Sequence, residues 1–265
     1  MGRPRRLQFS ASRGAILVTV LAHWAVVFLS CGCSSTSWTL FKRRPSSQTC
    51  LDLALEGETA DERRRGVNGL VSGSDATSEW VVKVFDTVAR TDTAPMVRSA
   101  ALRGLSLSAS AGSVPTAIRI LNSTKMRYRD VRPAPAVVRQ EAARLLLEIV
   151  DRYAYDELQR SKIVDVLLDR LRNDPDRAVR LTSIDTLAYF AQRPIPSVLI
   201  GVMESDDFAV RHAAEQALIA LTGVTRHHDP DAWRAWLADQ DDPFEHAGET
   251  PAELARDGGH HWWPW

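Results

Sequence analysis

Residues 174–180 read Asp-Pro-Asp-Arg-Ala-Val-Arg, and this segment joins two stretches of helical periodicity. Its Val-Arg pair opens a phrase with a small residue three positions after the Arg and a Leu seven positions after it. The phrase recurs along the chain, and successive arginines are 35, 41, 41 and 31 residues apart. A period of this size is typical of a solenoid of stacked helical repeats. The complete copies begin at Val97, Val138, Val179 and Val210, and a degenerate first copy begins at Glu62.

Around this segment the sequence predicts a helix, a turn and a second helix. The apolar spacing predicts a first helix from Ser161, and Asp and Pro in residues 174–176 supply its stop and the N-cap of the next helix. The second helix is predicted from Ala178 to about Gln192. The same reading gives first helices near residues 79–90, 114–121 and 196–204, and second helices near residues 96–108, 136–152 and 210–222.

The small residue of each phrase has a packing role. Ala101, Ala142, Ser183 and Ala214 each lie one turn inside a predicted helix, where a large side chain would hold neighbouring helices apart. The Leu seven positions after each Arg lies on the same face, and we expect it in the core.

This pattern resembles the HEAT-repeat family, in which Asp-Pro-x-x-x-Val-Arg-x-x-Ala opens the second helix of each pair. The resemblance covers about residues 46–223 and implies an all-α fold, a right-handed α-solenoid of about five helix pairs. It also implies that the repeat arginines bond to turn groups of the same or an adjacent repeat. The arginines with this structural role are Arg98, Arg139, Arg180 and Arg211. The alternative is that they form a row of basic side chains that faces a ligand.

In this family the second helices line the concave, binding face. We expect the positions one, two and five after each repeat Arg to be exposed there. No residue type recurs at these positions, which favours a mixed surface for a protein partner over one ligand per repeat. Arg64, Arg103 and Arg144 are the candidate partner-binding residues, as a basic strip; the alternative is an ordinary solvated helix face.

The N-terminus resembles a bacterial lipoprotein leader, assigned to residues 1–33. A basic segment precedes 16 uncharged, mostly apolar residues, and small residues with two cysteines follow. Cys33 is the preferred lipid attachment site and Cys31 the alternative, although neither has the favoured Leu three positions earlier. An uncleaved membrane anchor and a soluble exported protein are the other readings. Residues 34–45 are predicted to be a tether.

The C-terminal part divides into a cap at residues 224–244 and a flexible tail at residues 245–265. The cap carries Trp233 and Trp236 and resembles that of bacterial, chiefly planctomycete-type, HEAT-repeat lipoproteins. We expect it to cover the open end of the solenoid. The tail ends in three tryptophans between residues 262 and 265, which could dock on the solenoid, on a partner or at a membrane interface.

Charge and motif content argue against several functional classes. Without residues 1–33 the chain has 29 basic and 33 acidic residues, a net charge of −4, which gives no general attraction to nucleic acid. We find no P-loop, dinucleotide-binding turn or hydrolase motif. His227 and His228 are adjacent in a predicted loop, where histidines are usually solvated, so no metal site is assigned. We therefore predict no enzyme activity and no cofactor.

The sequence favours a non-catalytic protein-interaction scaffold anchored in the cell envelope as a lipoprotein that faces the periplasm or exterior. Its partners would be an unidentified protein and, through the N-terminus, a membrane, with no nucleic acid. Two alternatives remain: an enzyme-associated module similar to the HEAT-like phycobilin lyases, and a structural protein that binds envelope components.

Overall fold

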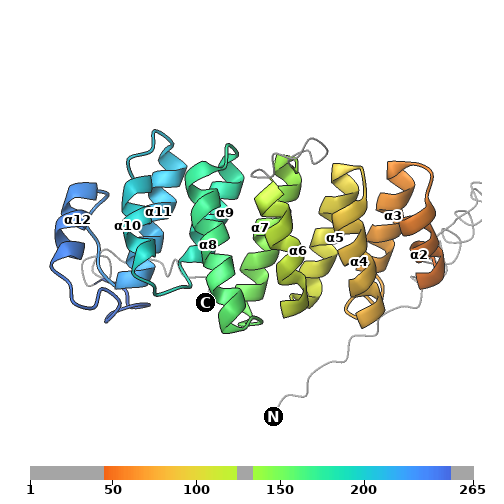
Figure 1. Ribbon diagram of the computed structural model, residues 1–265, viewed down its shortest axis with the longest axis horizontal. Helices are drawn as coiled ribbons and strands as arrows, with labels where there is room; N and C mark the ends of the chain where they lie inside the picture. Colours follow the sequence, from red (N-terminus) through yellow and green to blue (C-terminus); the bar gives the residue numbers. More distant parts are fainter. Residues whose placement is uncertain (1–44, 124–133, 252–265) are drawn as a thin grey trace, which may run out of the picture. The chain divides into compact units, whose positions relative to one another are not determined.

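The computed structural model describes residues 45–123 and 134–251, and these residues form α-helices with one short 3-10 turn. Five helix pairs stand side by side in a row, followed by a single helix (Figure 1). The predicted all-α solenoid of helix pairs is therefore confirmed, whereas its right-handedness stays a prediction. The pairs are α2 (Ser47–Glu56) with α3 (Ala60–Val71), α4 (Glu79–Thr91) with α5 (Pro95–Ser108), α6 (Val114–Asn122) with α7 (Ala136–Asp151), α8 (Glu157–Asn173) with α9 (Arg177–Leu187), and α10 (Pro194–Val202) with α11 (Phe208–Thr222). The 3-10 turn is η1 (Ala111–Ser113), and the single helix is α12 (Pro230–Ala238).

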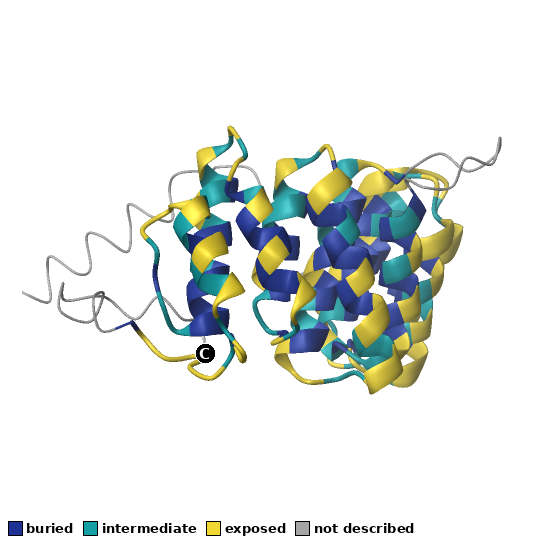
Figure 2. Ribbon diagram, turned by 60° about the vertical axis from the view of Figure 1, so that its left-hand side comes forward, coloured by how far each residue is buried: buried dark blue, intermediate teal, exposed yellow. Residues whose placement is uncertain are grey.

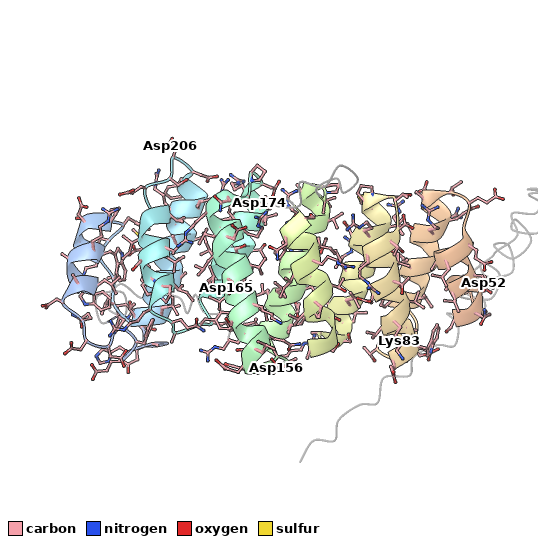
Figure 3. The ribbon with its side chains drawn as sticks, in the orientation of Figure 1. Asp52, Lys83, Asp156, Asp165, Asp174 and Asp206 are labelled. Carbon is pink, nitrogen blue, oxygen red and sulfur yellow. The ribbon has the colours of Figure 1, made fainter. Side chains whose placement is uncertain are left out.

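The helices form two layers. The second helices α3, α5, α7, α9 and α11 each contact the next second helix, and the first helices α2, α4, α6, α8 and α10 do the same in their own layer. All first helices run one way and all second helices the other. The turn inside each pair therefore lies at one edge of the row. Asp174 and Asp206 are at this edge, whereas Lys83 and Asp156 are at the opposite edge (Figure 3).

The core runs between the two layers without a break from the first pair to the last. All four small repeat residues and all four repeat leucines are buried at 0% exposure, as the spacing predicted. Figure 2 shows this buried seam between exposed outer surfaces. Only a small side chain fits at the positions of Ala101, Ala142, Ser183 and Ala214, because the neighbouring second helices pack closely there.

Local capping chemistry sets where several helices begin. The Asp176 and Asp207 carboxylates each accept two backbone N–H groups at the start of α9 and α11. Helix α8 begins at Glu157, four residues before the predicted start at Ser161. Asp156 and Gln159 form a reciprocal capping box there, which adds a turn that the apolar spacing alone does not indicate.

Two predicted boundaries near α10 are wrong. Helix α9 ends at Leu187 rather than near Gln192, and α10 spans Pro194–Val202 rather than residues 196–204. Proline is well suited to the first helical position because its missing N–H would be unpaired there. Helix α10 thus has 9 residues, against 17 in α8.

The C-terminal cap is built on a buried polar contact. Gly223 ends α11 in a left-handed conformation with φ of 68°, and an added Cβ would lie 2.2 Å from the His246 carbonyl oxygen. Trp233 of α12 is fully buried, and its indole Nε1 donates to the Glu215 carboxylate over 2.6 Å. Thr225 donates to the other Glu215 oxygen over 3.1 Å. The tryptophan therefore covers the end of the last repeat with its only polar atom paired.

Several predicted features lie outside the described residues. They are the leader at residues 1–33 with Cys31 and Cys33, most of the tether, and the last 14 residues of the tail. Within the described ranges, no helix combines the length and apolarity that a membrane span requires.

Candidate functional site

The first joint between repeats is held by a two-point ion pair. Arg63, the degenerate repeat arginine on α3, donates from Nε and Nη2 to the two Asp92 oxygens over 2.7 and 3.1 Å. Asp92 belongs to the turn of the next pair. Arg63 also donates to the Gly57 carbonyl of its own turn over 3.1 Å. The hydrogen bond to Asp92 raises the pKa of the Arg63 guanidinium.

The same contact recurs, more deeply buried, between the third and fourth repeats. Arg139 of α7 donates to the two Asp174 oxygens over 2.8 and 2.7 Å and to the Ala134 carbonyl of its own turn. The Arg139 side chain is 7% exposed and Asp174 is 0% exposed. Buried Arg170 adds a third, longer contact to Asp174 at 3.5 Å. A paired geometry of this kind offsets the cost of burying the charges.

The second repeat arginine, Arg98, is satisfied within its own pair. Its Nε donates to the Ala89 carbonyl over 2.8 Å. The side chain is half-buried, and this burial lowers the pKa of the Arg98 guanidinium. The position in the next turn that corresponds to Asp92 is residue 133, which lies outside the described residues.

The last joint lacks this two-point pair. Arg180 donates to the Asp174 carbonyl of its own turn over 3.1 Å, and its Nη2 lies 3.9 Å from Asp207. Arg211 donates to the Ser205 carbonyl over 2.8 Å. Asp92, Asp174 and Ser205 each stand six positions before a repeat arginine, so serine replaces the aspartate at the last joint. We call the pairs Arg63–Asp92 and Arg139–Asp174 the Arg–Asp ladder, which is interrupted at Ser205.

The resemblance implied turn groups of the same or an adjacent repeat as partners of the repeat arginines, but which carboxylate each arginine contacts was not predicted. Asp174 was interpreted only as a helix stop and cap. The missing signal was available in the spacing, because Asp recurs six positions before Arg98 and Arg180. That spacing gains meaning only when one turn is placed beside the helix of the preceding repeat.

The exposed side of the second helices, which we call the second-helix face, differs from the expectation. Ser99, Ala100 and Thr182 were predicted to be exposed, but they are buried. They lie on α5 and α9, which contact neighbouring second helices, and close packing of helices leaves room for small side chains. The fifth position after each repeat arginine forms the outer row, which reads Asn68, Arg103, Arg144, Asp185 and Gln216.

The three candidate partner-binding arginines have different surroundings. Arg64 pairs with Asp61 on its own helix at 3.0 Å, in an exposed contact. Arg103 reaches across to Glu141 of the next second helix at 3.0 Å. Arg144 is exposed, and none of the described carboxylates lies within ion-pair distance of it. Arg103 and Arg144 thus lie in neighbouring helices of one row, whereas Arg64 lies a turn away from that row.

An acidic position follows Arg144 in the same row. Burial of part of its carboxyl group raises the pKa of Asp185, and no hydrogen bond or ion pair to it is found among the described residues. The second-helix face therefore changes sign between α7 and α9. Among the described residues, this face has Arg144 without a carboxylate partner on α7 and Asp185 without a cationic partner on the adjacent α9.

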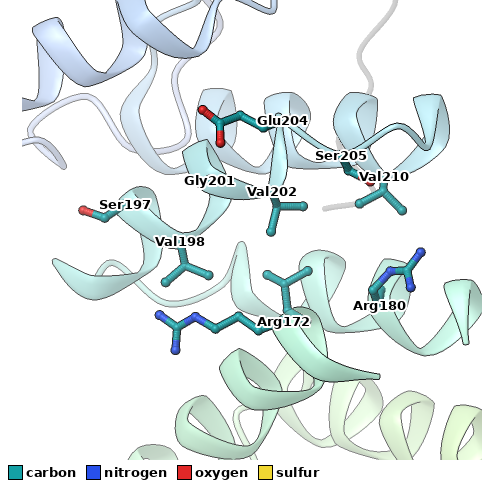
Figure 4. A pocket seen from close by; sticks show the side chains of 10 residues that line it. Arg172, Arg180, Ser197, Val198, Gly201, Val202, Glu204, Ser205 and Val210 are labelled. Carbon is teal, nitrogen blue, oxygen red and sulfur yellow. The ribbon is translucent and has the colours of Figure 1, made fainter. Parts of the chain in front are cut away.

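A cleft of about 700 Å³ opens at the interrupted joint, between α8 and α10 (Figure 4). Its apolar side chains include Leu171, Val198 and Val210, all nearly buried. Arg180 and Ser205 line it, so the break in the Arg–Asp ladder forms part of its wall. The volume lies in the range typical of ligand pockets.

Reactive groups are sparse in the described part of the chain. Within it, no three His, Cys, Asp or Glu side chains cluster so that they could hold a metal ion. The Cys50 thiol is buried against Gly69, and this burial raises the pKa of the thiol.

The comparisons with known proteins agree with this geometry. The family model for HEAT repeats matches residues 164–247, which run from α8 past α12. No curated protein matches the sequence. The same helix pairing and turn contacts extend from the matched region back to α2. Residues 164–247 of the chain therefore carry HEAT repeats.

Proposed function

We propose that the protein is a non-catalytic scaffold that binds a protein partner on its second-helix face and is anchored in the cell envelope. HEAT repeats commonly form protein-interaction scaffolds, and solenoids present extended surfaces for this purpose. The observation that carries the proposal is the outer row of the second-helix face. The repeat arginines are held in the turns, whereas Arg144 and Asp185 of the row are left without partners among the described residues.

The row defines what a partner should present. A complementary surface places a carboxylate against Arg144 and a cation against Asp185, one repeat further along. Opposite charges on adjacent helices fix the direction in which the partner lies, because the reversed orientation brings like charges together. Arg103 already pairs with Glu141 and contributes less unless the partner displaces that contact.

Photo-crosslinking in intact cells tests the partner. A photoreactive amino acid replaces Arg144 in one variant and Asp165, exposed on the first helix α8, in the matched control. We expect one dominant protein adduct from position 144 and not from position 165, identified by mass spectrometry. Equal adducts at both positions, or none at position 144, would contradict binding on the second-helix face.

The envelope anchor is a separate part of the proposal and rests on the leader sequence at residues 1–33. Metabolic labelling with an alkyne fatty acid in wild type, Cys33→Ser and Cys31→Ser should show label that is lost in Cys33→Ser alone, together with release from the membrane fraction. Loss in Cys31→Ser alone would move the site to the alternative cysteine. A mature protein that is unlabelled and absent from membranes would remove the anchor from the proposal.

A further inference from the structure

The last joint lacks the two-point pair and borders a cleft. Helix α10 has 9 residues and stands beside α8, which has 17. The cleft of about 700 Å³ lies between these two helices. Its floor is apolar, with Leu171 at 2%, Val198 at 9% and Val210 at 1% exposure. These groups are covered by the surrounding chain but border an open groove.

A second groove lies on the other side of the same helix. It has a volume of about 410 Å³ and is lined by residues of α10 and α12, among them Arg234 and Leu237. The two grooves share Ser197 and Gly201, which stand one turn apart on α10. We call the two grooves, together with the small residues Ser197 and Gly201 that line both of them, the α10 groove.

Gly201 has no packing role of its own. A Cβ added there would meet no atom within 4 Å, whereas one added at Gly104 would lie 2.7 Å from the Phe85 ring. Glycine in a helix is less stable than alanine. A glycine at Gly201 therefore costs helix stability without allowing a closer approach of two segments of this chain. Because glycine has no side chain, the middle of the α10 groove leaves room for another polypeptide chain to cross α10 at this position.

The charges at the α10 groove favour an acidic occupant. Arg180 lacks the two-point carboxylate that Asp174 provides to Arg139, because Ser205 stands in the corresponding place. Arg172 is exposed, and none of the described carboxylates is within ion-pair distance of it. Figure 4 shows the two guanidinium groups pointing in opposite directions along the cleft. The acid on this wall, Glu204, is already paired with Arg234.

We propose that the α10 groove binds an extended acidic segment of a partner protein, whose carboxylate occupies the place of the missing ladder aspartate. That carboxylate accepts hydrogen bonds from Arg180, a second acidic group pairs with Arg172, and an aliphatic side chain between them covers the apolar floor. The open shape of the joined grooves suits an extended backbone. This surface belongs to the first-helix side and is independent of the second-helix face.

The test uses the full chain and a random dodecapeptide library displayed on phage, followed by synthesis of the enriched peptide with a fluorescent label. We expect enriched peptides to combine Asp or Glu with Leu, Ile or Val. Binding measured by anisotropy should weaken by at least about tenfold in Ser205→Asp, because the new carboxylate takes the place of the peptide's own. Ser205→Asn is the matched control and should bind nearly as well as wild type.

Two further variants separate this proposal from other outcomes. Gly201→Trp fills the middle of the groove and should also abolish peptide binding, with the helical circular dichroism unchanged. No enrichment, a consensus without acids, or equal binding by Ser205→Asp would overturn the proposal. A dimer that Gly201→Trp converts to a monomer in light scattering would assign the groove to a second copy of the chain instead.

Discussion

The joint between the third and fourth repeats and the joint between the fourth and fifth use the same helix geometry but different chemistry. At the former, Asp174 receives two hydrogen bonds from Arg139 of the preceding repeat and is fully buried. At the latter, Ser205 occupies the corresponding position, and Arg180 lies 3.9 Å from its nearest carboxylate in the next turn. Both arginines still donate to a carbonyl of their own turn.

The difference separates two roles that one residue type can have in a repeat. The contact to the repeat's own turn fixes the local helix-turn-helix, and Arg139 and Arg180 share it. The contact to the next turn couples one repeat to its neighbour, and only Arg139 has it in full. In a solenoid, stability is approximately the sum of repeat terms and nearest-neighbour terms. We therefore expect the fourth and fifth repeats to be less tightly coupled than the third and fourth.

Removing the Asp174 carboxylate from the Arg–Asp ladder should have the largest effect on the free energy of unfolding. Asp174→Ala leaves Arg139 and Arg170 buried near one another without that acceptor, so we expect a loss of about 3–5 kcal/mol in the free energy of unfolding. Urea denaturation followed by circular dichroism measures it. Asp165→Ala on the exposed side of α8 is the control and should change stability by less than about 0.5 kcal/mol. A loss of the control's size in Asp174→Ala would show that the ladder contributes nothing.

The two arginines should respond unequally to the same change. Arg139→Met breaks the bonds to Asp174 and should cost about 2–3 kcal/mol, because charged hydrogen bonds are the stronger kind. Arg180→Met removes one hydrogen bond to a carbonyl from a side chain that is 25% exposed, and should cost about 1 kcal/mol. Melting curves of the two variants make the comparison directly. Equal losses would mean that the interruption at Ser205 has no energetic consequence.

Restoring the ladder should stabilise the last joint. Ser205→Asp places a carboxylate before Arg180, and we expect a gain of about 1 kcal/mol. The turn itself should tolerate the change, since Ser205 accepts the Asp207 N–H as Asp174 accepts the Asp176 N–H. Ser205→Asn, which lacks the charge, should gain less. In the double variant Arg180→Met with Ser205→Asp, the gain should disappear; a gain that persists would point to a cause other than this pair.

Much of the fold could be predicted because its determinants are local. The spacing of apolar residues gave the helix pairs, and the small residue after each repeat arginine gave the close contact between second helices. The start of α8 was missed because it depends on the Asp156–Gln159 capping box rather than on apolar spacing. The burial of Ser99 and Ala100 was not predicted, because it depends on how tightly the second helices pack.

The candidate sites were harder to predict because they arise between repeats. The acceptor role of Asp174 requires knowing which helix stacks beside its turn, and one repeat alone does not contain that information. The cleft lies between α8 and α10, which belong to successive repeats, and two prolines near the start of α10 displaced its predicted bounds. Two of the charged residues of the outer row, Arg103 and Arg144, were identified from their spacing after the repeat arginines, whereas Asp185 was not identified as a candidate.

The smallest expected effect on stability is that of Gly201→Ala, and it tests whether α10 is open on the side of Gly201 or packs against another segment. Gly201→Ala should raise the free energy of unfolding by about 0.5–1 kcal/mol, because alanine favours the helix and the new Cβ meets nothing within 4 Å. Gly104→Ala is the matched comparison inside a packed pair, where the Cβ would lie 2.7 Å from the Phe85 ring and should destabilise the fold by about 1–3 kcal/mol. Thermal melts of both variants give effects of opposite sign if the last joint is open in solution. If Gly201→Ala destabilises the protein as Gly104→Ala does, α10 packs against another segment, and the α10 groove is not free to bind a partner.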